Sequence, residues 1–202
     1  MDTLPSLPEF ARRTRFTEHM VLANGLGESF AGWLFLPGML FNASDKWWGG
    51  KGERIAPHEG LDLRLYEDAR GRVLLLGAGS SVPAVYDGTV KGIVDDFLGK
   101  TIIMEHRFPQ MPAFQLITLF GHTKPAGGVR PGEAVKAGDV MAAIASPGAS
   151  GKAVDCHLHV SLGRPSGAVA LASLNWQNMA EGLVMFDPVE ALDGPFRVYS
   201  PP

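Results

Sequence analysis

Residues 100–120 read KTIIMEHRFPQMPAFQLITLF, and this stretch sets the expectation for the fold. Two runs rich in apolar and β-branched residues, 100–105 and 114–120, flank a connection that contains two prolines. Short runs bounded by Gly or Pro are typical of β-strands joined by turns. Similar runs occur at residues 61–65, 72–76, 81–86, 89–94, 140–145 and 156–162.

The composition also favours strands. The 202 residues include 25 Gly and 15 Pro, yet the chain is still 46% hydrophobic. This combination provides frequent turns together with enough apolar surface for a core, so it indicates a β-rich domain rather than disorder. The length suits one domain with loops, or a smaller domain with an N-terminal extension.

Charge and hydropathy exclude several classes of partner. The formal net charge is -3 and no polybasic run occurs, which predicts neither a nucleic acid nor an anionic membrane as partner. No uninterrupted apolar stretch reaches the ~18 residues of a membrane span, and the first residues lack the pattern of an export signal. Cys156 is the only cysteine, so no internal disulfide is expected.

The segments outside the regular strand pattern carry helix and loop signals. Ser6 and Glu9 have the spacing of a capping box, which predicts a short helix ending at Arg13. Residues 16–41 alternate apolar runs with glycine turns and are expected to be rich in strands. Residues 42–57, which include WWGGKG, lack periodicity and predict a long loop. Two further helices are expected, at residues 168–179 and 187–192.

Two of the six histidines, His157 and His159, lie in the strand-like run CHLHVSL at residues 156–162. Residues two apart on a strand share a face, with Cα atoms ~6.6 Å apart. Both rings should therefore point into one space, where one can bind a metal and the other can act on what the metal holds. For this motif alone, a histidine pair that only follows the strand alternation is the commoner case.

His58 and Asp62 form a second group, in the sequence HEGLD. The fifth residue is Asp and the third is Gly, so this is not the helical HExxH motif of zincins. Gly60 permits a bend that turns both side chains toward one ion. Taken alone, a surface His and an exposed Asp in a turn explain this motif equally well.

Together, the pair His58 and Asp62 and one histidine of the pair His157 and His159 supply three nitrogen and oxygen ligands for one Zn²⁺ ion. A fourth position would remain for water, which is the arrangement of catalytic rather than structural zinc. Zinc bound in this way lowers the pKa of its water to about 7 and polarises carbonyl groups, so amide hydrolysis is the natural reaction.

The order of these motifs resembles that of the lysostaphin-type, LytM-like zinc metallopeptidases of bacteria, over roughly residues 54–192. The matching elements are PHEGLDL at 57–63, the strand, turn and strand at 81–90, FGHT at 120–123, the turn at 132–140, GASG at 148–151 leading to HLH at 157–159, and Asp187-Pro188 with Leu192. Thr123 replaces the leucine that is usual in the third element.

The resemblance implies that His58, Asp62 and His159 are the zinc ligands and that His122 and His157 lie beside the metal. One of these two histidines would take a proton from the attacking water, and the other would stabilise the oxyanion or protonate the leaving amine. All five residues are present, which counts against the inactive, partner-regulating members of the family.

The resemblance also implies a fold and a setting. The expected fold is all-β, with antiparallel sheets in a hybrid of sandwich and barrel, a surface groove and few short helices. Residues 45–195 would form this domain, after a strand-rich extension at 1–44. The implied substrates are peptidoglycan stem or cross-bridge peptides, or glycine-rich peptides, and the implied location is the periplasm or cell envelope. Trp47 and Trp48 could wall the groove or anchor the loop on the core.

Two other functions fit parts of the sequence. The turn EAVKAGDV at 133–140 is similar to turns of biotinyl or lipoyl carrier domains, although Lys136 lacks the flanking residues of a modified lysine. The second alternative is a zinc-binding protein that regulates cell-wall enzymes without hydrolysing peptides. The sequence leaves the oligomeric state open.

Overall fold

The computed structural model describes residues 5–49, 52–146 and 154–200. The strands are β1 (Phe30–Phe35), β2 (Leu61–Leu63), β3 (Leu65–Asp68), β4 (Val73–Leu75), β5 (Ser81–Pro83), β6 (Gly88–Asp95), β7 (Lys100–Phe108), β8 (Met111–Pro125), β9 (Ala134–Val135), β10 (Val140–Ile144), β11 (Leu158–Pro165), β12 (Leu183–Phe186) and β13 (Phe196–Val198). The α-helices are α1 (Glu9–Arg12), α2 (Phe16–Ala23) and α3 (Met179–Gly182), and the 3-10 helices are η1 (Gly27–Ser29), η2 (Pro37–Met39), η3 (Leu171–Ser173) and η4 (Pro188–Ala191).

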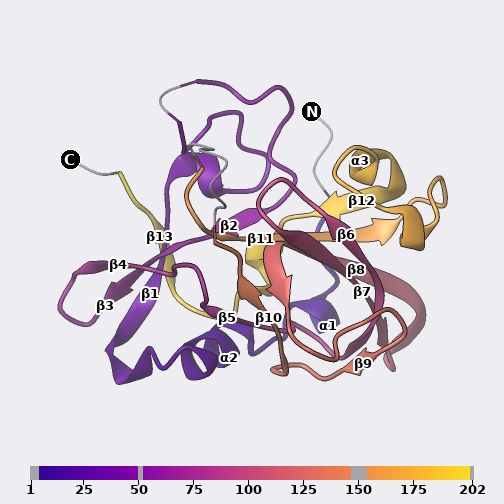
Figure 1. Cartoon of the computed structure of the whole chain (residues 1–202), viewed down its shortest axis with the longest axis horizontal. Coiled ribbons are helices and arrows are strands. Elements are labelled where there is room, and N and C mark those ends of the chain that lie inside the picture. The colour runs from indigo at the N-terminus through magenta and orange to yellow at the C-terminus, as the bar shows by residue number, and fades with distance from the viewer. Residues whose placement is uncertain (1–4, 50–51, 147–153, 201–202) are drawn as a thin grey trace.

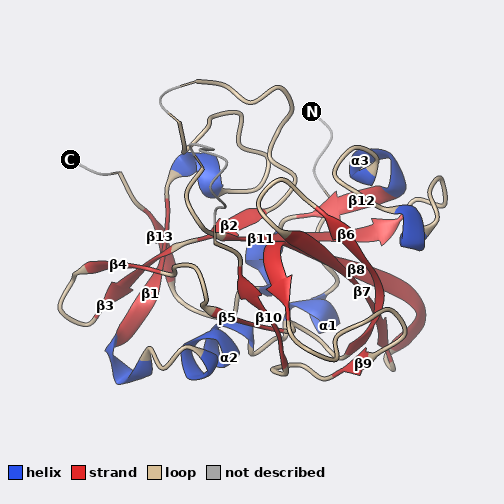
Figure 2. Ribbon diagram, viewed as in Figure 1, coloured by secondary structure: helices blue, strands red, loops and turns tan. Residues whose placement is uncertain are grey.

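Within the described ranges the strands form two sheets (Figures 1 and 2). The smaller sheet has the order β13-β1-β3-β4. The larger follows β12-β11-β8-β7-β6-β9, with β2 beside β11, β10 beside β8, and β5 beside β10. The pairing of β1 with β13 is parallel, and the other pairings between described strands are antiparallel. The all-β class with few short helices is therefore confirmed.

Strand β8 passes through the centre of the larger sheet, and both of its faces are covered. Leu116 and Phe120 belong to the main core cluster. Ile117 and Leu119 belong to a second cluster that includes Leu174 and residues of α3 and β12. Burial on both faces explains why residues 114–120 of this strand are mostly apolar and do not alternate regularly with polar residues.

The N-terminal residues pack into the same core as the larger sheet. Ala11, Phe16 and Met20 lie in the main cluster. The Tyr86 hydroxyl donates a hydrogen bond to the Ala11 carbonyl at 2.5 Å. These contacts tie the segment before β1 to the strands that follow, while the boundary expected at residue 44 stays a prediction.

The expected secondary structure is wrong at two places near the N-terminus. Residues 16–23 form α2 rather than a strand, because Phe16 and Met20 are buried one helical turn apart. The short helix expected to end at Arg13 is present as α1, but it begins only at Glu9 and has no side-chain cap. The capping box does not form, since the Ser6 hydroxyl donates to the Glu190 carboxylate at 2.7 Å.

The helix expected at residues 168–179 is also wrong, apart from the short η3 and the first residue of α3. The Asn178 side chain accepts from the Asn175 backbone N–H at 2.9 Å, and the Asn175 side chain accepts from the Gln177 N–H at 2.8 Å. Such local side-chain bonds offer the backbone an alternative to a helix.

Two other local predictions are confirmed. Residues 187–192 contain the 3-10 helix η4, which is capped by the Asp187 side chain through a 2.9 Å bond from the Val189 N–H. The described part of residues 42–57 is a loop, joined across its base by a bridge between Asp45 and Glu53. The GASG element at 148–151 lies outside the described residues. None of the described helices has both the length and the hydropathy needed to cross a bilayer.

His106 on β7 is a buried histidine outside the group of candidate site residues. That group comprises His58, Asp62, His122, His157 and His159. Its Nδ1–H donates to the Asp87 carbonyl at 2.9 Å, and its Nε2 lies 2.8 Å from the Thr118 hydroxyl. Burial lowers the pKa of His106 to about 4, against the usual 6.5. The neutral ring is therefore part of the core, and it supplies no chemistry for a site.

We predict that His106 makes the fold sensitive to acid. Between pH 6.5 and about 4 the unfolded chain binds a proton that folded His106 does not, so stability falls as the pH falls through this window. The full loss is about 3 kcal/mol. Free energies of unfolding of the metal-free protein, measured across this pH range, should depend less steeply on pH in His106→Gln. Equal slopes in the variant and the wild type would contradict the assignment.

Candidate active site

The pairing of β2 with β11 brings together three of the residues singled out in the sequence. In this antiparallel pair, His159 lies directly opposite Asp62. Directly opposed residues have neighbouring side chains on the same face of a sheet. The His159 Nδ1 is 2.8 Å from the Asp62 Oδ1. His58, four residues before Asp62, places its Nε2 3.3 Å from the same oxygen and 3.2 Å from the His159 Nδ1.

Gly60 makes the turn between His58 and Asp62 possible. A Cβ atom at this position would lie 2.6 Å from the Val160 carbonyl oxygen and closer still to the His159 Nε2. The bend therefore passes so near to β11 that only glycine fits. This close approach is what lets both side chains of the HEGLD motif face His159.

The three side chains fit a metal ion with one open side. Their ligand atoms all lie within 4.8 Å of one another, and all three residues are buried. Two imidazole nitrogens and one carboxylate oxygen form a donor set that zinc prefers. The His58, Asp62 and His159 set predicted from sequence is thus brought together by the fold.

Each of the three candidate ligands has a second hydrogen-bond partner. The His58 Nδ1–H donates to the Leu40 carbonyl at 2.9 Å, which leaves Nε2 free to bind a metal. The His159 Nε2 is 2.8 Å from the Ser161 hydroxyl, which can accept its proton when Nδ1 is the ligand. The Trp47 indole N–H donates to the Asp62 Oδ2 at 2.6 Å. Such outer partners fix the tautomer and orientation of metal ligands.

The protonation states also suit metal binding. Burial alone would raise the pKa of Asp62, but its close contacts with His157, His58 and His159 hold it well below its usual range. Burial lowers the pKa of His159. An ionised carboxylate and a neutral imidazole are the forms in which these groups bind metals.

His157 precedes β11 and turns its ring toward the same centre. Its Nδ1–H donates to the Asp155 carbonyl at 2.7 Å, so Nε2 faces inward, 3.5 Å from the Asp62 Oδ1. Burial lowers the pKa of His157 to about 4. The His122 ring lies beside it, with the two ring centroids 4.7 Å apart. The two histidines predicted to assist catalysis therefore lie together beside the candidate metal ligands.

His122 occupies an irregular point in β8. Its φ of 62° is in the left-handed region, which is uncommon for a residue other than glycine. Gly121 and His122 together face Thr101 of β7, so this point is a β-bulge. Bulges re-aim side chains near active sites, and here the bulge directs His122 toward His157.

Asp96, which the sequence analysis did not single out, holds His122 at this bulge. Its carboxylate accepts from the His122 backbone N–H at 2.8 Å and lies 3.2 Å from the ring Nδ1. It also accepts from the backbone N–H groups of Leu98 and Gly99 and from the Thr101 hydroxyl. Burial opposes its ionisation, but these bonds keep the pKa of Asp96 well below its usual range. In the sequence, an Asp three residues before a Gly signals only a turn.

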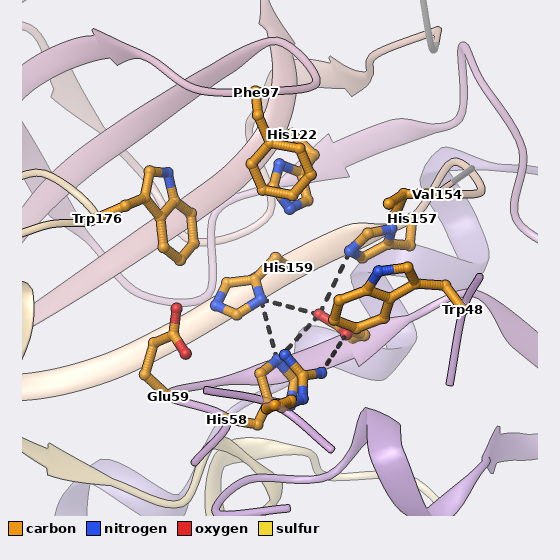
Figure 3. Close-up of a pocket in the computed structure, with 11 residues that line it drawn as sticks. Trp48, His58, Glu59, Phe97, His122, Val154, His157, His159 and Trp176 are labelled. Carbon is orange, nitrogen blue, oxygen red and sulfur yellow. Dashed lines mark hydrogen bonds and ion pairs between the residues drawn. The ribbon is translucent and has the colours of Figure 1, made fainter. Parts of the chain in front are cut away.

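A pocket of about 140 Å³ opens over the candidate ligands (Figure 3). Aromatic side chains of Trp48, Phe97 and Trp176 stand around the imidazole rings. Phe97 and Trp176 also line a more open neighbouring hollow of about 540 Å³. The side chains thus form a surface depression with an aromatic rim and a polar floor.

The two tryptophans of the 42–57 loop have different positions. Trp48 lines the pocket, and the Arg54 guanidinium lies 4.4 Å from its ring centroid. Trp47 packs edge-on against His157, with centroids 5.0 Å apart, and directs its N–H to Asp62. The groove role expected for this pair stays a prediction.

The sequence profile of Peptidase family M23 matches residues 67–170, a range that contains His122, His157 and His159 and begins after His58 and Asp62. A comparison with curated proteins found no match.

Two solved structures illustrate the similarity. A mutant catalytic domain of the prophage-encoded M23 protein EnpA from Enterococcus faecalis is 22% identical, with 67% of this chain and 87% of that chain covered and a TM-score of 0.39. The solution structure of lysostaphin is 19% identical, with 69% of this chain and 49% of that chain covered and a TM-score of 0.41. The chain thus spans about half the length of the lysostaphin structure.

We predict that Gly60→Ala weakens zinc binding by at least about tenfold, since the new Cβ must displace His159 or β2. Gly52→Ala is the matched control, because a Cβ there meets nothing within 4 Å. Zinc dissociation constants are measured by competition with a chromophoric chelator. An unchanged affinity in Gly60→Ala would show that the close approach to β11 does not matter for the metal.

Proposed function

The chain belongs to Peptidase family M23, and on this premise we propose that it is a zinc-dependent endopeptidase. The membership confirms the family resemblance drawn from the motifs. The observation that carries the proposal is the buried set His58, Asp62 and His159, whose ligand atoms lie within 4.8 Å of one another at the floor of a pocket.

In this proposal His58 Nε2, Asp62 Oδ1 and His159 Nδ1 hold one zinc ion. Zinc in such a site supplies a Lewis acid that activates water and polarises a peptide carbonyl. Leu40, Trp47 and Ser161 support the proposal, because their hydrogen bonds leave these three ligand atoms directed inward.

His122 and His157 carry the proton transfers in the proposed reaction. The bond from the His157 Nδ1–H to the Asp155 carbonyl leaves its Nε2 as an acceptor within the site. The Asp96 carboxylate fixes the ring of His122 through Nδ1. One of the two histidines removes a proton from the attacking water, and the other stabilises the oxyanion or protonates the leaving amine.

The proposed substrates are peptides of the bacterial cell wall, in stems or cross-bridges, or glycine-rich peptides. The depression over the site is small and flanked by Trp48, Phe97 and Trp176. An extended chain with small side chains suits such an aromatic rim, because its backbone can approach the floor closely. The proposed setting is the periplasm or cell envelope, with residues 45–195 as the peptidase domain and 1–44 as an extension packed on it.

The two alternatives from the sequence predict different outcomes. A regulator would hold zinc without cleaving peptides. A carrier domain would add a prosthetic group to Lys136, which here forms a 2.8 Å ion pair with Asp87 on the surface. Intact mass measurement identifies a carrier, and the following assay separates a peptidase from a regulator.

We predict that the purified protein binds about one zinc per chain and releases fragments from peptidoglycan or glycine peptides, as measured by metal analysis and mass spectrometry of the products. Chelation should abolish the hydrolysis, and added zinc should restore it. His157→Ala should retain zinc and lose about a hundredfold or more in rate, the scale of a missing general acid or base.

Two results would count against the proposal. Protein that holds zinc but cleaves none of these peptides would favour the regulator. An unchanged rate in zinc-loaded His157→Ala would remove that residue from the mechanism.

We predict that Asp96→Asn lowers kcat by about a hundredfold while zinc content is preserved, because the carboxylate that fixes the His122 ring is lost. Asp95→Asn is the matched control, since the Asp95 side chain is 86% exposed and pairs only with Lys100 among the described contacts. Steady-state kinetics and thermal unfolding are compared for both variants. Equal kcat values in Asp96→Asn and Asp95→Asn would show that the pairing with His122 is not needed.

A further inference from the structure

The two oxygens of the Asp62 carboxylate have different surroundings. Oδ1 faces three imidazole nitrogens, at 2.8 Å for His159, 3.3 Å for His58 and 3.5 Å for His157. Oδ2 points the other way, toward residues of the 42–57 loop. The carboxylate therefore has one oxygen directed to the candidate metal position and one held by the protein.

Trp47 makes the short contact to the held oxygen. Its indole N–H donates to Oδ2 at 2.6 Å, whereas the Arg54 guanidinium is 3.6 Å away. Two Arg54 nitrogens donate to other groups, Nη2 to the Gly38 carbonyl at 2.9 Å and Nε to the Asp45 carbonyl at 3.2 Å. Arg54 thus supplies nearby positive charge, and Trp47 supplies the directional bond.

The indole is an apt group for this position. It is a donor only and does not titrate, so it can neither accept a proton from the site nor compete as a metal ligand. Its ring is fixed by edge-on packing against His157 at 5.0 Å and against Trp48 at 5.6 Å. The direction of the N–H is therefore set by two ring contacts as well as by its bond to Asp62.

The loop that carries Trp47 is itself attached to the fold. The Lys46 N–H donates to the Gly52 carbonyl at 2.9 Å, and the Arg54 N–H donates to the Ser44 carbonyl at 2.7 Å. A Cβ at Gly38 of η2 would lie 2.9 Å from the Trp47 backbone nitrogen, so the loop lies tightly against η2. These contacts hold the loop where the Trp47 indole reaches Asp62 on β2.

We propose that Trp47 is a positioning residue for the metal: its indole N–H orients the Asp62 carboxylate so that Oδ1 is presented to the ion. The 42–57 loop is then a structural part of the metal site rather than only a wall of the groove. This inference rests on the zinc site of the proposed function. Loss of an outer partner of a metal ligand typically costs 10–100-fold in metal affinity.

The test compares Trp47→Phe with Trp48→Phe in the full chain. Both substitutions remove one indole N–H and keep an aromatic ring in the same loop, but only the first removes a donor to Asp62. Zinc dissociation constants are measured by competition with a chromophoric chelator. We expect the constant to rise about 10–100-fold in Trp47→Phe and to stay within about threefold of wild type in Trp48→Phe.

A second readout separates positioning from a general loss of stability. The midpoint of thermal unfolding of the metal-free proteins should be similar for the two variants. At a fixed zinc concentration, the rise in the midpoint on adding zinc should be smaller for Trp47→Phe, because stabilisation by a ligand grows with the ratio of its concentration to its dissociation constant.

Equal zinc affinity in wild type and Trp47→Phe would overturn the inference, as would an equal loss in both variants. Wild-type protein that binds no zinc would overturn both the inference and the proposed function. Wild-type protein that binds zinc but cleaves no peptide would refute the proposed function alone, and a selective loss of zinc affinity in Trp47→Phe would then still support the role of Trp47.

Discussion

The cross-strand pair of Asp62 on β2 and His159 on β11 is the contact on which the rest of the site depends. The antiparallel register places these residues directly opposite each other, so their side chains meet without any further bend of the chain. The chain bends at Gly60, close against β11, and this bend places the His58 side chain beside Asp62 and His159. A shift of this register by one residue would turn His159 to the other face of the sheet and separate it from His58 and Asp62.

Burying so many polar side chains in one place is costly unless each has a partner. Here the partners come from separate parts of the fold. The 3-10 turn η2 and the loop that follows it provide the Leu40 carbonyl and the Trp47 indole. The turn between β6 and β7 provides Asp96. The site is thus an assembly of elements whose hydrogen bonds hold His58, Asp62 and His122 in one orientation.

The same elements explain why strain is tolerated at His122. A left-handed conformation costs a residue with a side chain about 1–2 kcal/mol. The bond from its backbone N–H to Asp96 and the stacking of its ring beside Trp176, with centroids 5.7 Å apart, favour this conformation. Strained residues held in this way concentrate at functional sites, which agrees with the role proposed for His122.

The sequence by itself indicated most strands of the larger sheet, because apolar and β-branched runs bounded by Gly or Pro are local features. Its HEGLD, FGHT and HLH motifs carry the five candidate residues of the site. It could not determine α2, since the burial of Phe16 and Met20 on one face is decided by what packs against them. In the sequence Asp96 signals only a turn, and Trp47 is placed in a loop beside the groove or on the core, with nothing that links either residue to its partner in the site. Asp96 contacts His122 across 26 residues of sequence, because the turn after β6 folds back onto β8. Trp47 contacts Asp62 across 15 residues, because the 42–57 loop folds back onto β2. Hydrogen bonds of this kind depend on positions in space, so only the tertiary structure decided which side chains orient the site.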